Sequence, residues 1–592
     1  MATVDPHSYA DPDQGRTTRV ALKLDVDFES RRLVGTATLG LDATSGGHLD
    51  LDTRDLDIQK VELGDGTALK FELGDKDAVL GQKLRVMVPD GTDEITITYR
   101  TSPEASALQW LEPANTAGKK HPYLFSQCQA IHARSMAPLQ DSPRCRIPYT
   151  AEITVPDPLV AVMSAAPGES RKGVKAETTT WSFEMPQAIP PYLLALAVGN
   201  LVSEDLGPRS RVYTEPEMLK ASAWEFATID DMLRKAEELF GEYRWGRFDF
   251  LVMPPAFPYG GMENPRLTFL TPSLIAGDRS LVEVLAHELA HSWTGNLVTN
   301  ATNEHFWLNE GFTVWAERRI NEVLEGEEAV ALSSALGREA LQGEIDRFGA
   351  DSKYTALYNE QAGVDPDDVY SQVPYEKGCL FVTLMEKTVG REKFDHFLRD
   401  YMDTFQFRSL DTEEFLDFLE LKLPGLAEKI GAKEWVYEPG IPANEPKVES
   451  ARLSELKALA AGWHDGSRPD ADVKDKWSVA EWLVYLGALP NDIGEDGCAW
   501  IDRTFTLTGS GNSEILCKWL VMAIDNGYDA VYDKSRAFLG SIGRMKYLKP
   551  MYKALSDNPK SEELAMKIFD EHKGMYHPIA RGGLEAILGV KA

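Results

Sequence analysis

The feature that most constrains the fold of this chain is a pair of histidines followed by a glutamate. His287 and His291 are the outer residues of a His-Glu-Leu-Ala-His motif, and Glu310 follows after eighteen intervening residues. Residues four apart on an α-helix lie on one face, about one turn from each other. Both imidazoles can therefore face one metal ion, provided that a second helix brings Glu310 to the same point. Two histidines and a carboxylate are the ligands of a catalytic zinc ion, which keeps its fourth position open.

Two further glutamates lie close to these ligands in the sequence. Glu288, next to the first histidine, is placed to take a proton from a water molecule at the metal. The motif therefore predicts a peptidase with one Zn²⁺ per chain, although this type of ligand does not exclude cobalt or manganese. Glu317 lies two turns beyond Glu310 on the same helix face. It is either a residue that orients a ligand imidazole or an ordinary surface glutamate.

Length and charge limit the class of protein. A chain of 592 residues is too long for one hydrophobic core, so we expect three or four domains. The formal net charge of −31 argues against nucleic acid as a partner and against an anionic membrane surface. The acidity favours solubility, or alternatively a surface that attracts cationic substrates.

The cysteines and the N-terminal sequence indicate the cellular compartment in which the protein is expected. Five scattered cysteines, without a CxxC pair, are typical of free thiols in a reducing environment. The chain starts without the basic and apolar segments of a signal peptide. It also lacks a run of about 18 apolar residues that could span a membrane. We therefore expect a cytoplasmic protein without a membrane partner, and we expect a monomer.

The hydrophobic pattern changes twice along the chain. Apolar residues alternate with other residues over segments such as 20–28, 33–41 and 94–99, which predicts an all-β domain over residues 1–200. Residues 201–438 are mainly helical and contain the zinc motif, so they form the predicted catalytic domain.

Local patterns predict the elements of the remaining chain. We expect a helix over 223–243, a strand over 248–253 and two metal-bearing helices over 281–293 and 308–322. Residues 439–455 form the predicted linker, which is rich in Gly, Pro and Asn at its start. Residues 456–592 are helical again, and we expect a C-terminal domain of paired helices.

A second cluster precedes the zinc motif and consists of Gly260, Gly261, Met262, Glu263 and Asn264. Two glycines allow a backbone to approach a ligand closely, and Glu263 supplies a fixed negative charge. Alone, this segment is typical of a turn. Beside a zinc helix it predicts a peptide-binding edge that offers a carboxylate to an α-ammonium group.

The order of these motifs resembles the M1 family of zinc aminopeptidases. Four more segments resemble its three-domain, leukotriene A4 hydrolase-like branch: SQCQA at 126–130, WLNEG at 307–311, VPYEKG at 373–378 and GRMK at 543–546. They run from the β region to the C-terminal helices, so the resemblance spans nearly the whole chain. It implies a multidomain α+β fold with an N-terminal all-β domain, a thermolysin-like, mainly helical catalytic domain and a C-terminal domain of paired helices.

The resemblance also implies roles that spacing alone does not predict. Glu263 would bind the free N-terminus of a peptide, and Tyr375 would donate to the oxyanion of the tetrahedral intermediate. The glycine segment would contribute Gly260, Gly261 and Met262 to substrate binding, and the β domain would extend two glutamines into the cleft, Gln127 and Gln129. The specificity pocket would be lined by Tyr259, Phe306, Asp367 and Tyr370.

Two basic residues near the C-terminus complete the implied site. Arg544 and Lys546 would hold the C-terminal carboxylate of a short peptide. Taken alone, this pair is typical of a solvated charged surface, just as Tyr375 and Tyr370 alone are typical of core or surface tyrosines. Only the residues that flank them give them a role.

The predicted function is removal of N-terminal residues from short peptides with a free N-terminus. The alternative is a bifunctional enzyme of the leukotriene A4 hydrolase type that also hydrolyses a fatty epoxide. A non-catalytic binding protein is disfavoured because Glu288, Tyr375 and all three ligands are present. An endopeptidase is disfavoured because the segment at 260–264 would block extended binding on the N-terminal side of the substrate.

Overall fold

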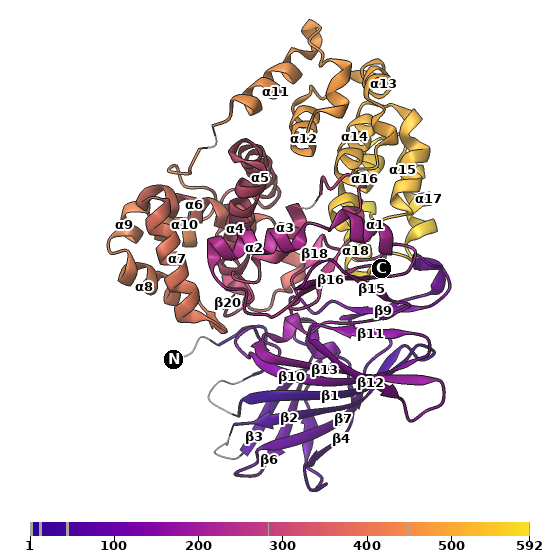
Figure 1. Cartoon of the computed structure of the whole chain (residues 1–592), viewed down its shortest axis with the longest axis vertical. Coiled ribbons are helices and arrows are strands. Elements are labelled where there is room, and N and C mark those ends of the chain that lie inside the picture. Colours follow the sequence, from indigo (N-terminus) through magenta and orange to yellow (C-terminus); the bar gives the residue numbers. More distant parts are fainter. Residues whose placement is uncertain (1–3, 11–14, 43–46, 282, 448, 591–592) are drawn as a thin grey trace.

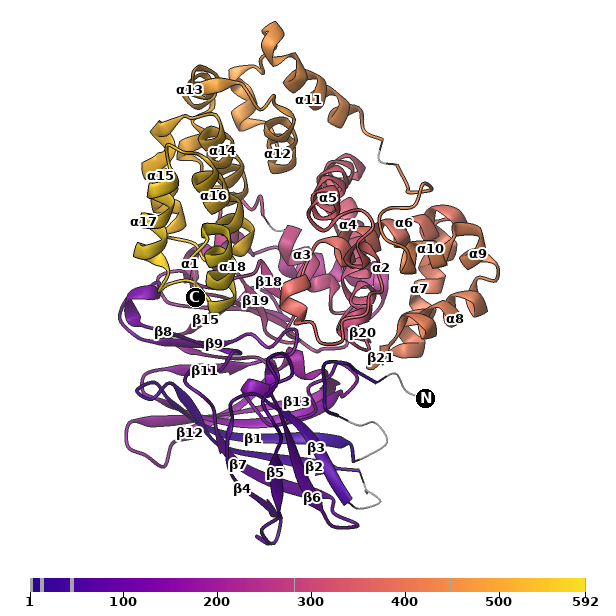
Figure 2. The ribbon, with the colours of Figure 1, turned by 180° about the vertical axis from the view of Figure 1, so that it is seen from behind.

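The structure is a computed structural model that describes residues 4–10, 15–42, 47–281, 283–447 and 449–590. A β domain carries two groups of helices side by side, which belong to the catalytic and the C-terminal domains (Figures 1 and 2). The predicted multidomain α+β fold is confirmed. The predicted boundaries at 200, 438 and 455 stay predictions.

The largest sheet of the β domain has seven strands in the order β12-β13-β10-β1-β2-β7-β4. Its central strands β1 and β10 are parallel. The alternating pattern of β1 points Val20, Leu22 and Leu24 into the core, as predicted. The strands are β1 (Thr17–Asp27), β2 (Arg32–Leu41), β4 (Asp57–Leu63), β7 (Glu94–Arg100), β10 (Ile147–Pro156), β12 (Ala166–Lys172) and β13 (Thr178–Ile189).

Two smaller sheets complete the β domain. A three-stranded sheet contains β3 (Gly47–Thr53), β6 (Gln82–Val88) and β5 (Phe71–Leu73). A four-stranded sheet contains β11 (Val160–Met163), β14 (Leu196–Gly199), β9 (Tyr123–Ser126) and β8 (Leu108–Leu111). Strand β9 ends at Ser126 and leads directly into the loop that carries Gln127, Gln129 and His132.

A five-stranded sheet follows the β domain in the chain and carries the glycine segment. Its order is β15 (Val202–Asp205), β16 (Ser210–Thr214), β17 (Phe248–Val252), β19 (Thr268–Leu270) and β18 (Gly261–Met262). Strand β17 is parallel to both neighbours and buried along its length, which explains why four of its five residues are apolar, Asp249 being the exception. The glycine segment forms the edge strand β18, so one side of its backbone is free to meet a ligand.

The helix predicted over 223–243 is wrong as one element. The chain forms α1 (Leu219–Glu225) and α2 (Ile229–Phe240), separated by a turn. The buried Glu225 carboxylate accepts hydrogen bonds from the backbone N–H groups of Gly277 and Arg279. This contact fixes the end of α1 against the loop before the zinc motif, and the helical pattern of the sequence does not predict it.

The metal-bearing helices lie at the centre of the catalytic domain. They are α3 (Glu283–Ala290) and α4 (Trp307–Glu325), and α4 also packs against α6 (Gly378–Val389). At that crossing a Cβ atom on Gly311 would lie 2.7 Å from the Cα atom of Gly378, so only glycine allows this approach. The crossing brings Glu310 of α4 close to the π-helical turn Val373–Lys377, which carries Tyr375.

The remaining elements of the catalytic domain surround this centre. They are α5 (Glu327–Phe348), α7 (Arg391–Phe405), α8 (Thr412–Lys422), α9 (Leu426–Ile430), α10 (Ala432–Tyr437) and the strand pair β20 (Val298–Asn300) and β21 (Arg408–Leu410).

The C-terminal helices enclose a second hydrophobic core, to which Leu332 of α5 also belongs. The first of them begins at Ala451, within the predicted linker. The helices are α11 (Ala451–Ala461), α12 (Val479–Ala488), α13 (Gly494–Phe505), α14 (Ser513–Asp525), α15 (Tyr532–Leu539), α16 (Met545–Asp557), α17 (Glu562–His572) and α18 (Pro578–Leu588).

Two sequence observations can be compared with the structure directly. All five cysteines are free thiols, and four of them are buried. Among the described helices, none has both the length and the apolar character needed to cross a membrane.

Candidate active site

The three predicted metal ligands meet at one point. The Nε2 atoms of His287 and His291 lie 3.1 Å apart. The Oε2 atom of Glu310 lies 3.5 Å from the Nε2 atom of His287 and 3.6 Å from that of His291. Helix α3 supplies His287, His291 follows directly after the helix, and α4 supplies Glu310. The sequence therefore predicted correctly that a second helix brings the carboxylate to the histidines.

This ligand set fits a zinc ion. Tetrahedral bonds of about 2.0–2.1 Å separate the ligand atoms by roughly 3.3–3.4 Å, close to the distances between these three side chains. The Oε2 atom of Glu310 is buried and has no hydrogen-bond partner among the described residues. An unpaired carboxylate oxygen in a buried position is costly unless a cation binds it. The described residues thus form a group able to hold Zn²⁺.

The outer nitrogen of each ligand imidazole has its own partner. His287 Nδ1 lies 2.9 Å from Oε2 of Glu317, and His291 Nδ1 lies 3.2 Å from the carbonyl oxygen of Thr294. Because these acceptors take the Nδ1 protons, both Nε2 atoms keep their lone pairs for a metal. Of the two interpretations of Glu317, the structure supports the one that orients an imidazole.

Glu288 lies between the metal site and the glycine segment. Its carboxylate is buried, and burial raises its pKa to about 8. A Cβ atom on Gly261 would overlap the Glu288 carboxylate, so glycine is required for this packing. A buried, weakly solvated carboxylate next to the ligands is suited to accept and return a proton.

Glu263 belongs to a second group of possible ligands, which consists of two carboxylates and one histidine. Glu263, Glu288 and His291 have ligand atoms within 4.8 Å of one another. Burial, together with the charges of Glu310 and Glu288, holds the pKa of Glu263 well above its ordinary value. Cations at this position, a metal ion or an ammonium group, would therefore be strongly favoured. Gln129 reaches Glu263 from the β domain, with 3.4 Å between its Nε2 atom and Oε1.

Aromatic side chains surround the other side of the ligands. The ring of Tyr375 is stacked at 6.2 Å from the His287 ring and contacts Phe306 edge-on at 6.0 Å. The hydroxyl of Tyr370 donates to the Tyr375 hydroxyl over 3.2 Å. Tyr259 lies beside Tyr370, with ring centres 6.3 Å apart. Burial raises the pKa of Tyr375 well above its ordinary value, so its hydroxyl stays protonated and can donate.

The two basic residues of the C-terminal domain share one acid. Lys546 Nζ lies 2.7 Å and Arg544 Nη1 3.5 Å from Oε1 of Glu514, which also accepts a 2.9 Å hydrogen bond from Tyr547. Two cations on one carboxylate leave a net positive charge for an anionic group. The Arg544 guanidinium lies directly against Gly260, where a Cβ atom would come within 2.5 Å of it.

One cavity of about 1030 Å³ joins these parts and is lined by residues of all three domains. Its wall includes every predicted catalytic and metal residue and most of the predicted substrate-binding residues: Gln129, Tyr259, Gly260, Gly261, Glu263, Phe306, Asp367, Tyr370, Arg544 and Lys546. Gln127 and Met262 do not line it. They contact each other behind the wall, with 3.2 Å between Gln127 Nε2 and Met262 Sδ.

The sequence interpretation missed two residues of this region. Glu514 in the first turn of α14 forms ion pairs with Arg544 and Lys546. The sequence could have indicated such a partner, because these two basic residues have no acidic residue close to them in the chain. His132 of the β domain contacts Asp367 over 2.9 Å. It lies three residues after Gln129 in the same loop, but a lone histidine gave no chemical signal.

The fold and this site together define a zinc metallopeptidase. Matches to family models agree along the chain: "Peptidase M1 N-terminal domain" over residues 5–193, "Peptidase family M1 domain" over 224–433 and "Leukotriene A4 hydrolase, C-terminal" over 477–588.

Individual proteins are similar over their whole length. Leucine aminopeptidase 2 of Yarrowia lipolytica is 39% identical, covering 98% of this chain and 92% of that protein. Leukotriene A-4 hydrolase of Xenopus laevis is also 39% identical, covering 97% of each chain. A solved structure of yeast LTA4 hydrolase in complex with Bestatin superimposes with a TM-score of 0.92 at 34% identity, covering 99% of this chain and 97% of that one. The chain belongs to the M1 family of zinc metallopeptidases and carries the C-terminal domain of leukotriene A4 hydrolases.

Proposed function

We propose that the chain is a zinc-dependent aminopeptidase that removes N-terminal residues from short peptides. The position of Glu263 carries this proposal, since its carboxylate lies within 4.8 Å of ligand atoms of Glu288 and His291. An α-ammonium group on Glu263 leaves room for one residue between itself and the metal site. Substrates would be cut after their first residue for this reason.

The ligand set His287, His291 and Glu310 would hold one zinc ion per chain. When bound, Zn²⁺ supplies Lewis-acid chemistry that polarises the scissile carbonyl and acidifies a water molecule. Glu288 takes the proton of the attacking water and later passes one to the leaving amine. Its buried carboxylate, next to His287 in sequence and packed against Gly261, is placed for both proton transfers.

Substrate binding uses both ends of the peptide. Glu263 binds the α-ammonium group, and the Tyr375 hydroxyl donates to the oxyanion that forms at the scissile carbonyl. Arg544 and Lys546, which together outweigh the charge of Glu514, attract the C-terminal carboxylate. Anchors at both ends favour short peptides over folded proteins.

A second candidate function is hydrolysis of a fatty epoxide, as the name of the similar Xenopus laevis protein suggests. The volume of the cavity supports it, because about 1030 Å³ exceeds what a dipeptide occupies. Arg544 and Lys546 could bind the carboxylate of a fatty acid as well as that of a peptide. Incubation with leukotriene A4 and analysis of the diol products would test this candidate directly.

The aminopeptidase proposal is tested with aminoacyl-anilide substrates, with and without a free α-amine, before and after removal of zinc by a chelator. We expect chelator-sensitive turnover of the free-amine substrates alone. Turnover of blocked substrates at the same rate would reject Glu263 as the N-terminal anchor. No turnover by the zinc-loaded protein would reject the aminopeptidase function. The monomeric state and the cytoplasmic location remain predictions.

A further inference from the structure

A hydrogen bond joins the β domain to the wall of the substrate cavity. His132 Nε2 lies 2.9 Å from Oδ2 of Asp367, a residue 235 positions further along the chain. His132 is buried in the loop after β9, while Asp367 lies in the short helical turn Pro366–Val369 and lines the cavity. The contact therefore connects a residue outside the cavity with one that lines it.

The surroundings of His132 determine which nitrogen carries the proton. Its Nδ1 atom lies 3.3 Å from Nη1 of Arg54 and 2.8 Å from Oγ of Ser106. A guanidinium group can only donate, so Nδ1 is the acceptor. The proton of the neutral imidazole is then on Nε2, which donates to the Asp367 carboxylate.

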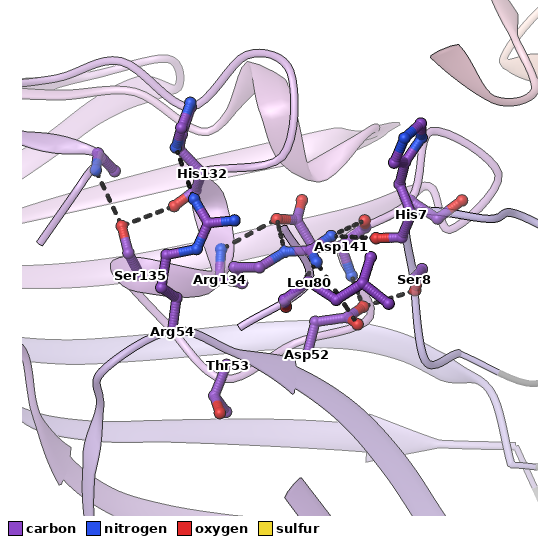
Figure 3. A network of polar contacts seen from close by, with 12 residues as sticks. His7, Ser8, Asp52, Thr53, Arg54, Leu80, His132, Arg134, Ser135 and Asp141 are labelled. Atoms are coloured by element: carbon purple, nitrogen blue, oxygen red, sulfur yellow. Dashed lines mark hydrogen bonds and ion pairs between the residues drawn. The ribbon is translucent and has the colours of Figure 1, made fainter. Parts of the chain in front are cut away.

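His132 is held by a rigid polar network at the base of its loop (Figure 3). The Ser135 hydroxyl donates to the His132 carbonyl over 2.8 Å. Arg134, which is fully buried, donates from Nε to Asp141 over 3.0 Å and from Nη2 to the carbonyl of His7 over 2.6 Å. Such a network fixes the loop backbone, so the imidazole has little freedom to follow a moving Asp367.

The same network contacts the Asp367 segment at a second point. His7 Nε2 lies 2.9 Å from the carbonyl oxygen of Val364. The backbone near Val364 and the carboxylate of Asp367 are thus each bonded to a buried histidine of the β domain. One contact places the segment, and the other orients the carboxylate within it.

We propose that His132 is a positioning residue for substrate selection, which fixes the Asp367 carboxylate in the pocket for the first side chain of the peptide. This inference rests on the proposed aminopeptidase function. Asp367 lines the same cavity as Tyr259, Tyr370 and Phe306, the three aromatic residues expected to line the specificity pocket with it. The Asp367 carboxylate attracts a cationic first side chain of the peptide and does not attract an apolar one. The resulting difference in affinity depends on where the carboxylate lies in the pocket.

The test compares kcat/KM for arginyl- and leucyl-anilides in the wild type and in His132→Phe, His132→Gln, Asp367→Asn and the double variant His132→Phe/Asp367→Asn. We expect His132→Phe to lower the arginyl-to-leucyl ratio by at least about fivefold, a coupling typical of residues in contact. The double variant should be no lower than Asp367→Asn alone. His132→Gln, which keeps an N–H donor, should recover most of the ratio.

His7→Phe is the matched control, since it removes a buried histidine of the same network that contacts only the backbone of the Asp367 segment. Its melting temperature should fall as in His132→Phe, while its substrate ratio stays near the wild-type value. An equal loss of the ratio in His7→Phe would show that only loop position matters and would overturn the proposal. Additive losses in the double variant would also overturn it.

Failure of the proposed aminopeptidase function can be distinguished from failure of the proposed role of His132. If the wild type hydrolyses neither anilide, calorimetric binding of arginine amide and leucine amide to the zinc-loaded variants replaces turnover. The binding ratio should then respond to His132→Phe and to Asp367→Asn in the same direction. A ratio that responds to Asp367→Asn but not to His132→Phe would refute the role of His132.

Discussion

The Oε2 atom of Glu317 lies 2.9 Å from the Nδ1 atom of His287, on the side of the imidazole opposite the metal site. The position of Glu317 two turns after Glu310 on α4 makes this contact possible, because both carboxylates face α3. One helix thus supplies a metal ligand and the residue that orients another ligand. The histidine is fixed before any metal binds.

Replacement of Glu317 should therefore weaken metal binding. Glu317→Ala is expected to lower zinc affinity by roughly 10–100-fold, the usual effect of losing such a partner. Glu317→Gln retains an acceptor oxygen and should lose less. Competition with a chromogenic chelator measures both affinities. Equal affinity in Glu317→Ala and wild type would show that Glu317 does not orient His287.

The general base is tested by Glu288→Gln, which keeps the shape of the side chain and removes its charge. Since Glu288 is not one of the three ligands, zinc content should stay at one ion per chain. We expect kcat on leucyl-anilide to fall by about 10²–10⁴-fold, as for loss of a positioned proton acceptor. Residual activity above a tenth of the wild type would be incompatible with this role.

Tyr375→Phe tests the donor to the oxyanion. The loss of one such donor typically costs about 10²–10³-fold in kcat, with little change in KM. Tyr370→Phe is the comparison variant, because it removes the neighbouring hydroxyl, which donates to that of Tyr375. Steady-state kinetics should show a much smaller effect for Tyr370→Phe. Similar losses in both variants would contradict a unique role for Tyr375.

Gly261→Ala tests how the edge strand and the proton acceptor fit together. The added Cβ atom would overlap the Glu288 carboxylate, which has to rotate away. We expect kcat to fall by at least about tenfold with zinc binding unchanged, because a displaced base loses its alignment with the water. Steady-state kinetics and metal analysis check both expectations.

Gly343→Ala is the control for this substitution. It lies within α5, and a Cβ atom at this position meets no neighbouring atom within 4 Å. The change should leave kcat unaltered and stabilise the fold by about 0.5–1 kcal/mol. A comparable loss of kcat in Gly343→Ala would mean that the Gly261 result does not report on Glu288.

Much of the fold follows from local sequence patterns. The alternating apolar residues of β1 and the zinc motif, which begins on α3 and ends directly after it, both depend on neighbours within a few positions, and the structure confirms them. The break between α1 and α2 does not follow, because Glu225 bonds to backbone groups more than fifty residues away. A tertiary contact overrides helical periodicity here.

The difference between local patterns and tertiary contacts also decides which parts of the active site could be predicted. The metal ligands could be predicted because helix geometry places His287 and His291, four residues apart, on the same side. The contact between His132 and Asp367 could not, since the two residues are 235 positions apart and neither belongs to a spaced motif. Glu514 was missed for the same reason, because it meets Arg544 and Lys546 only when α14 packs beside α16.

Lys377 predicts a pH dependence of stability. It is fully buried at the end of the turn Val373–Lys377, and its Nζ atom donates to the carbonyl oxygens of Thr355 and Glu438 over 2.9 and 2.8 Å. Burial lowers its pKa to about 7 from an ordinary value of 10.5. A neutral amine still has two protons for these two carbonyls, so the folded protein loses no hydrogen bond when Lys377 is uncharged.

The direction in which stability changes with pH follows from the number of protons that the folded and unfolded chains bind. Between pH 7 and 10.5 the unfolded chain binds the Lys377 proton and the folded chain does not. Stability contributed by this group therefore rises with pH across that window, by up to about 1.4 kcal/mol per pH unit, and is constant below it. Lys377→Met, which cannot titrate, should lack this contribution.

The measurement is the melting temperature of wild type and Lys377→Met at a series of pH values from about 6 to about 9. The difference should grow in favour of the wild type as pH rises above about 7, because only the wild type gains from losing the proton. Lys387→Met, an exposed substitution on α6, is the matched control and should follow the wild type. A constant difference between wild type and Lys377→Met would show that Lys377 keeps its charge in the folded protein.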